Sequence, residues 1–142
     1  SEGVNSNTLA LIKDGILKNY LVDTYNGKKL NLKSNGRSSG TTNLYFENGN
    51  ISFENLTKKN SRSLYITETI GHGSNLVTGD YSVGASGFLV EDGEFKYPVN
   101  EVTIAGNFKD MFKNLILAND LEFEYSVNSP TMMIEGMTVA GK

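Results

Sequence analysis

The sequence contains no cysteine, no tryptophan and a single histidine, His72, among its 142 residues. Structural zinc sites use four protein ligands and catalytic sites use three, so a zinc site made of Cys and His cannot be assembled from this chain. The lack of cysteine also excludes a thiol nucleophile and a disulfide framework. Zinc sites of this kind and thiol chemistry are therefore ruled out for the chain by itself.

Long apolar runs and clusters of positive charge are missing as well. The 13 basic and 16 acidic side chains give a net charge of -3, and the basic residues are scattered. Nucleic-acid affinity comes mainly from concentrated Lys and Arg, so we expect no nucleic-acid partner. No stretch of about 18 apolar residues could span a bilayer and no secretory leader is visible, so we expect a cytoplasmic protein with no membrane partner.

The residues that are present suit one globular domain. Apolar residues make up 38% of the chain, which is enough for a hydrophobic core. A chain of 142 residues has the size of one ordinary domain, so we expect residues 1–142 to form a single domain. The chain begins without methionine and its first seven residues are mostly polar. We expect residues 1–7 to be a processed or flexible end, and the chain to be a fragment of a longer protein.

Alternating apolar and polar residues, interrupted by turn dipeptides, predict antiparallel hairpins. The predicted turns are Asp14-Gly15, Asn48-Gly49 and Asp92-Gly93. Pro98 is expected to end the pairing of the third hairpin or to mark a sheet edge. Further strands are predicted at residues 63–67, 102–104, 121–127 and 132–139, and residues 121–127 alternate most cleanly.

One segment has the helical period instead. From Asn107, a good N-cap, apolar residues recur at helical spacing as far as Ile116, which predicts an amphipathic helix over about residues 107–118. Weaker helical turns are predicted at residues 24–30 and 52–59, and residues 34–42 are expected to form a mobile loop. The predicted fold class is α+β, a β-rich domain of antiparallel hairpins with one amphipathic helix.

Glycine and hydroxyl residues are concentrated at residues 71–87, so this segment is the first place to look for a site. A phosphate-binding loop would need a helix after it, whereas the following residues predict a strand. A Ser/His/Asp arrangement is formally available from Ser74 or Ser82, His72 and Asp80, but a triad is defined by geometry in space. The plainer interpretation is that the glycines permit bends while polar side chains satisfy turn amides.

Motifs in the same segment and beyond it resemble a known family. The segment Gly-His-Gly-Ser-Asn begins at Gly71 and Thr-Gly-Asp-Tyr-Ser begins at Thr78; Tyr-Pro-Val from Tyr97 and Thr-Ile-Ala-Gly-Asn from Thr103 follow in order. Together with the C-terminal Ala-Gly-Lys, this pattern resembles the C-terminal domain of the TldD/PmbA family. The resemblance covers nearly the whole chain from about Leu9.

The resemblance implies a subunit of a cytoplasmic zinc metallopeptidase, in which a TldD-type and a PmbA-type (TldE) subunit enclose a chamber. In that family zinc is bound by a His-Glu-x-x-x-His helix upstream, with a further Cys in the C-terminal domain of the TldD-type subunit. This chain has no Cys, so it resembles the PmbA type, which lacks zinc. The resemblance therefore implies a TldD-like partner that carries the zinc and no catalytic or metal residue in this chain.

Six residues of the glycine-rich segment are then expected to form a structural loop or a wall of the substrate chamber, next to an unfolded peptide. These residues are His72, Asn75, Thr78, Asp80, Tyr81 and Ser82. Two alternatives stay open from sequence. One is a non-proteolytic module that binds another protein, since the family is also named for modulation of DNA gyrase and is linked to degradation of an antitoxin. The other is a serine hydrolase that uses His72.

Overall fold

The computed structural model describes Asn5, residues 7–37 and residues 40–141. By its internal contacts the chain divides into two compact units. The smaller unit comprises Ser1–Tyr45 and Glu124–Val127, and the larger one comprises Phe46–Phe123 and Asn128–Lys142. The predicted flexible end at residues 1–7 and the predicted mobile loop at residues 34–42 lie partly outside the described residues. The prediction of a single domain stays a prediction.

The smaller unit begins with the first predicted hairpin. Strands β1 (Ile12–Lys13) and β2 (Ile16–Leu17) pair antiparallel. Asp14 and Gly15 both have left-handed φ values, 53° and 72°, as a type I′ turn requires. Helix α1 (Thr24–Leu30) follows, as predicted, and the Asp23 carboxylate caps it by accepting a hydrogen bond of 2.6 Å from the Asn26 backbone N–H.

The larger unit is organised around an antiparallel sheet of four strands in the order β10-β6-β5-β4. Its strands are β4 (Arg62–Ile70), β5 (Asp80–Glu91), β6 (Glu94–Asn107) and β10 (Thr138–Ala140). The β5–β6 hairpin turns at Asp92-Gly93, with φ values of 51° and 83°, so this prediction is confirmed. Val83, Ala85, Val102 and Ile104 form the buried core of the sheet.

Pairing of β5 with β6 does not end at Pro98. Pro98 stands opposite Phe88, close to two register shifts, and β6 continues to Asn107. Strand β10 pairs only with residues 103–105 of β6, so within the described residues Pro98 lies where β6 has one neighbour. A proline is tolerated there because no second strand needs its missing N–H. The edge alternative of the prediction is therefore correct.

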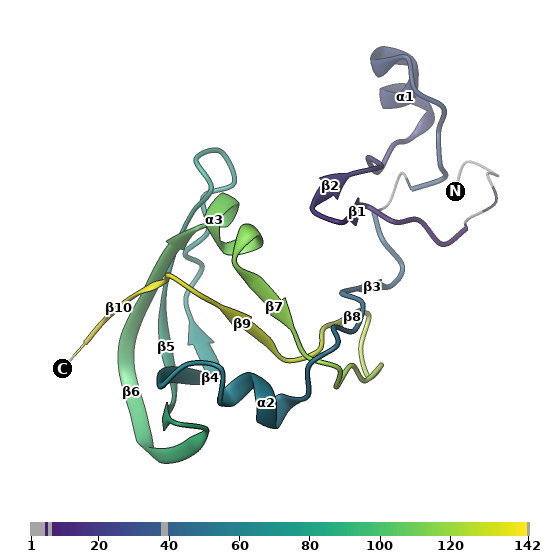
Figure 1. Cartoon of the computed structure of the whole chain (residues 1–142). Helices are drawn as coiled ribbons and strands as arrows, with labels where there is room; N and C mark the ends of the chain where they lie inside the picture. Colours follow the sequence, from purple (N-terminus) through teal and green to yellow (C-terminus); the bar gives the residue numbers. More distant parts are fainter. Residues whose placement is uncertain (1–4, 6, 38–39, 142) are drawn as a thin grey trace. The chain divides into compact units, whose positions relative to one another are not determined.

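Short elements complete the larger unit. Helix α2 (Phe53–Thr57) is capped by Ser52, which confirms the predicted helical turn. Helix α3 (Phe108–Lys113) follows β6 and begins at Asn107 as predicted. Figure 1 shows α3 at the end of β6 that is opposite the β5–β6 turn. Strand β7 (Leu115–Leu117) pairs with β9 (Met132–Ile134) as a separate two-stranded sheet. The α+β class with antiparallel sheets is confirmed.

The predicted helix over residues 107–118 is wrong beyond Lys113. Asn114 ends α3 with its N–H donated to the Asp110 carbonyl. Leu115 and the two residues after it pair instead with β9, and β-branched Ile116 stands opposite Met133. Strand pairing outweighs the helical period of these apolar residues, since helix propensity is weak against tertiary contacts.

Two strand predictions are also wrong. Asn48-Gly49 is no hairpin turn: β3 (Leu44–Tyr45) pairs with β8 (Val127–Asn128), and Ile51 forms a parallel bridge to Ala118. A Cβ at Gly49 would overlap the Leu117 carbonyl, so this glycine serves a close approach of two chain segments.

Most of residues 121–127 form no strand either, because only Val127 at their end enters a pairing. The Asp120 carboxylate holds the segment closed as a loop by accepting from the Thr131 N–H and hydroxyl, both at 2.7 Å. The predicted last strand at residues 132–139 is divided by Gly136 into β9 and β10, which pair with different partners.

Candidate functional site

The glycine-rich segment connects β4 to β5 and continues into β5. After Gly71, whose φ is 95°, the chain folds back so that Gly73 lies against β5. The Ser82 N–H donates to the Gly73 carbonyl at 2.8 Å, and Ser74 bridges to Tyr81. A Cβ at Gly73 would overlap the Ser82 carbonyl oxygen, so only glycine allows this approach.

Asn75 builds the turn at the tip of this connection. Its side-chain oxygen accepts from the N–H groups of Val77 and Thr78, at 3.0 and 3.2 Å. Its backbone N–H donates to the Asp80 carbonyl, and its own carbonyl accepts from Gly79, both at 2.8 Å. Four hydrogen bonds thus fix residues 75–80 as one rigid turn, in the manner of an Asx motif.

Asp80 and Thr78 are joined to the start of α3 by Asn107. The Thr78 hydroxyl donates to Asp80 Oδ2 at 2.7 Å, and Asn107 Nδ2 donates to Asp80 Oδ1 and to the Thr78 carbonyl, each at 3.1 Å. These hydrogen bonds, from Thr78 first and then Asn107, hold the pKa of the Asp80 carboxyl below its usual value. Asn107 Oδ1 also accepts from the Lys109 N–H at 3.1 Å and so caps α3.

The sequence identified Asn107 as a helix cap and as the last residue of the Thr-Ile-Ala-Gly-Asn motif, but not as a partner of the glycine-rich turn. Asn107 pairs with Asp80 where β5 begins and β6 ends, and this pairing places Asn107 next to the turn at residues 75–80. The Phe108 N–H adds a bond of 2.8 Å to the Gly79 carbonyl. The sequence signal that could have predicted this contact is the register of the β5–β6 hairpin. If residues are paired outward from the Asp92-Gly93 turn, Asp80 and Asn107 come close together at the far end.

The structure brings some of the predicted residues together and separates others. Asn75, Thr78 and Asp80 form the turn, and the half-buried ring of Tyr81 lies 5.6 Å from that of Phe108. The Ser82 side chain is exposed on β5. Within the described part of the chain, exposed His72 makes no hydrogen bond. The Asp80 carboxylate is bound to Thr78 and Asn107, so the geometry does not support a Ser/His/Asp triad.

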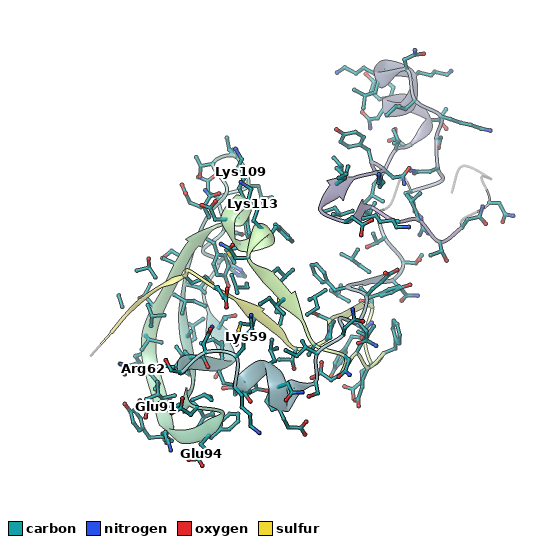
Figure 2. The ribbon with its side chains drawn as sticks, in the orientation of Figure 1. Lys59, Arg62, Glu91, Glu94, Lys109 and Lys113 are labelled. Atoms are coloured by element: carbon teal, nitrogen blue, oxygen red, sulfur yellow. The ribbon has the colours of Figure 1, made fainter. Side chains whose placement is uncertain are left out.

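A phosphate-binding loop is equally unsupported. The segment leads into strand β5 and not into a helix N-terminus. The tip of the turn instead presents two apolar side chains to solvent: Leu76 is 87% exposed and Val77 is 95% exposed. Figure 2 shows Lys109 and Lys113 on α3 at this end of the larger unit. The arrangement is a rigid protruding turn that suits contact with another chain better than chemistry.

A zinc ion does not fit the donor set. The sequence offers no Cys and one His, and His72 lies in an exposed loop. Among Asn5 and residues 7–37 and 40–141, no three His, Cys, Asp or Glu side chains are grouped in a way that could hold a metal ion. No helix in these residues is both long and apolar enough to cross a membrane.

Comparison with known proteins decides the family. Residues 1–141 match the family model of the PmbA/TldA metallopeptidase C-terminal domain. The chain belongs to this family. Metalloprotease PmbA of Escherichia coli O157:H7 is 43% identical over 143 residues, which cover 100% of this chain and 32% of that protein.

Two solved structures have the same fold. A Thermotoga maritima protein named as a modulator of a DNA gyrase is 32% identical, with a TM-score of 0.87 over 97% of this chain and 34% of its own. TldE from Thermococcus kodakarensis is 27% identical, with a TM-score of 0.80 over 98% of this chain and 35% of its own. The chain therefore spans about a third of the length of these relatives. The resemblance to the PmbA and TldE type is confirmed.

Proposed function

We propose that this chain is the C-terminal domain of the non-metal subunit of a TldD/TldE-type zinc metallopeptidase in the cytoplasm. In this role it forms part of the wall of the proteolytic chamber and helps to hold an unfolded peptide. The TldD-type partner supplies the zinc, which activates the water for hydrolysis. The single observation that carries the proposal is the donor set: a member of a metallopeptidase family has no Cys and one isolated, exposed His in this domain.

The turn at residues 75–80 supports a role as a wall. Five of its six backbone N–H groups, all but that of Leu76, donate within the turn, and its one carboxylate accepts from Thr78 and Asn107, so its backbone is held in place before any partner arrives. A preorganised surface loses little entropy on binding. His72, Tyr81 and Ser82 flank this turn and are proposed as wall residues, with no catalytic role.

The test compares three samples of natural-length protein on an unfolded, fluorescently quenched peptide: this protein alone, a TldD-type partner alone, and the two together. The proposal predicts metal-dependent cleavage only when the partner is present, and a stoichiometric complex on size-exclusion chromatography. Cleavage by this protein alone would refute it. A serine-reactive fluorophosphonate probe should not label the chain; labelling that His72→Ala abolishes would support the hydrolase alternative instead.

A second candidate function is a non-proteolytic module that binds another protein. It is favoured by the name of the similar Thermotoga maritima protein, a modulator of a DNA gyrase. Copurification separates the two functions. Recovery of a metal-containing TldD-like subunit supports the peptidase complex, whereas stable recovery of gyrase or an antitoxin without such a subunit supports the binding module.

A further inference from the structure

All the sulfur of this chain is gathered around one cavity of the larger unit. The chain has four methionines and no cysteine, and all four methionines line this cavity: Met111, Met132, Met133 and Met137. They come from three separate segments, namely helix α3, strand β9 and the residues just before β10. With no thiol in the chain, these thioethers are the sulfur atoms that an oxidant would attack.

The cavity is large enough to admit a small oxidant. Its volume is about 820 Å³, whereas one water molecule needs only roughly 10–15 Å³, and hydrogen peroxide is little larger than water. Met132 is 38% exposed, and the other three methionines are half-buried. None of the four is fully enclosed, so the methionine cluster is accessible to a peroxide from solvent.

One end of the methionine cluster holds a hydrogen-bond donor. Asn60 Nδ2 donates to Met133 Sδ at 3.6 Å and to Glu135 Oε1 at 3.2 Å. A thioether sulfur is only a weak acceptor. Oxidation converts the thioether into a polar sulfoxide, whose oxygen is a much better acceptor. Asn60 is therefore placed to bind the oxidised form of Met133 more strongly than the reduced form.

The other end of the methionine cluster is apolar. Met111 and Met137 meet beside Gly106, because a Cβ on this glycine would lie 3.4 Å from Met111 Sδ and 3.5 Å from Met137 Cε. Met137 also packs against the buried core of the four-stranded sheet. A polar group that is buried without a hydrogen bond costs free energy. A sulfoxide should therefore disrupt the packing at Met137, whereas Met133 has a donor for it.

We propose that Met133 is a site of reversible oxidation by hydroperoxides, and that Asn60 holds the resulting sulfoxide in the folded protein. With hydrogen peroxide, a lone pair of Sδ attacks one oxygen, the O–O bond breaks and an S–O bond forms. The sulfur loses two electrons, and the peroxide is reduced to water, which leaves with both protons. Methionine sulfoxide reductases restore the thioether. This modification needs neither zinc nor a partner subunit, so it goes beyond the proposed function.

The first experiment treats the natural-length protein with hydrogen peroxide and locates the added oxygen by tandem mass spectrometry of its peptides. Met132→Leu removes the neighbouring thioether, so that Met133 is read without ambiguity. We expect Met133 to gain one oxygen atom while the circular dichroism spectrum stays unchanged, and sulfoxide reductases with dithiothreitol to remove that oxygen. No oxygen at Met133 under conditions that oxidise free methionine completely would overturn the proposal.

The second experiment tests Asn60 by hydrogen–deuterium exchange of β9 before and after oxidation. In Asn60→Ala the sulfoxide has lost its donor, so oxidation should accelerate exchange about two- to tenfold more than it does with Asn60 present, as expected for one hydrogen bond. Each protein is compared with its own reduced form, so the other contact of Asn60, with Glu135, is lost from both sides of the comparison. Equal responses of the two proteins would refute the role of Asn60.

Two glutamine substitutions test the same idea without an oxidant, since glutamine also carries an oxygen acceptor on an unbranched side chain. Met133→Gln can accept from Asn60 and should keep a Tm close to that of wild type. Met137→Gln is the matched comparison, because it places an amide against the sheet core, and it should lower Tm by several degrees or fail to fold. Equal or greater damage from Met133→Gln would contradict the assignment of Met133 as the tolerant site.

The outcomes also separate this inference from the proposed function. A natural-length protein that supports cleavage with a TldD-type partner, but is not oxidised at Met133, refutes the oxidation site and leaves the subunit assignment intact. A protein that is oxidised at Met133 and reduced again, but forms no metallopeptidase complex, refutes the subunit assignment and leaves the oxidation site intact.

Discussion

Asn107 links the glycine-rich turn to α3, so its replacement by alanine should loosen both at once. The substitution removes the cap on the Lys109 N–H and the hydrogen bonds to the Thr78 carbonyl and to Asp80 Oδ1. An N-cap is worth about 1 kcal/mol and a neutral hydrogen bond about 0.5–1.5 kcal/mol, with the lower part of that range suited to this exposed site. The cap and the Thr78 bond together amount to roughly 1.5–2 kcal/mol.

The assay is thermal unfolding followed by circular dichroism, where a loss of this size should lower Tm by about 6 °C for a chain of this length. Ser52→Ala is the matched control, because Ser52 caps α2 through the Asn55 N–H and its hydroxyl makes no other hydrogen bond among the described residues. It should lower Tm by about half as much. Amide exchange at Val77 and Thr78 should accelerate only in Asn107→Ala. Equal effects of the two substitutions would refute the reasoning that Asn107 holds the turn.

Three further predictions concern pH, packing and metal. The pKa of Asp80 is lowered in the folded state. Its ionised carboxylate therefore stabilises the fold at neutral pH, and this stabilisation is lost as pH falls through the lowered pKa. The Tm difference between wild type and Asp80→Asn should shrink below about pH 4. Gly87→Ala should cost roughly 2–3 kcal/mol in urea unfolding, because its Cβ would overlap the Tyr65 carbonyl, whereas Gly84→Ala meets only ordinary contacts and should be tolerated. Treatment with EDTA should leave the Tm of this chain unchanged, and a fall in Tm would contradict the proposal that this chain binds no metal.

Local turn chemistry made part of the fold predictable. Asp14-Gly15 and Asp92-Gly93 both adopt the left-handed conformations that this dipeptide favours. Each forms the turn of the hairpin that its flanking residues predict. The capping residues Ser52 and Asn107 likewise mark the true starts of α2 and α3. These features depend on a few neighbouring residues, so the sequence carries the information directly.

The incorrect predictions concern contacts between distant segments. Leu115 and Ile116 satisfy the helical period, but Ile134 and Met133 pair with them as a strand. Phe123 and Tyr125 alternate like strand residues, yet they are 67% and 76% exposed in a loop that Asp120 closes. Periodicity shows that apolar residues recur at a given spacing, but it does not show which other segment is available to pair with them. It therefore could not exclude a helix beyond Lys113 or a strand at residues 121–127.

The candidate site was predictable in composition but not in geometry. Asn75, Thr78 and Asp80 are turn-forming residue types, and the structure brings them together. The role of Asn107 depends on the β5–β6 register. This role requires the assembled sheet, because Thr78 and Asp80 must meet a residue nearly thirty positions further along the chain.

The zinc content of the natural-length protein tests the central claim most directly. The protein and a TldD-type partner are purified separately and together, dialysed against metal-free buffer, and measured by inductively coupled plasma mass spectrometry. The account predicts no stoichiometric zinc in this protein alone, and zinc in the complex only at the level that the partner brings. One zinc bound per molecule of this protein alone would contradict the assignment as the non-metal subunit.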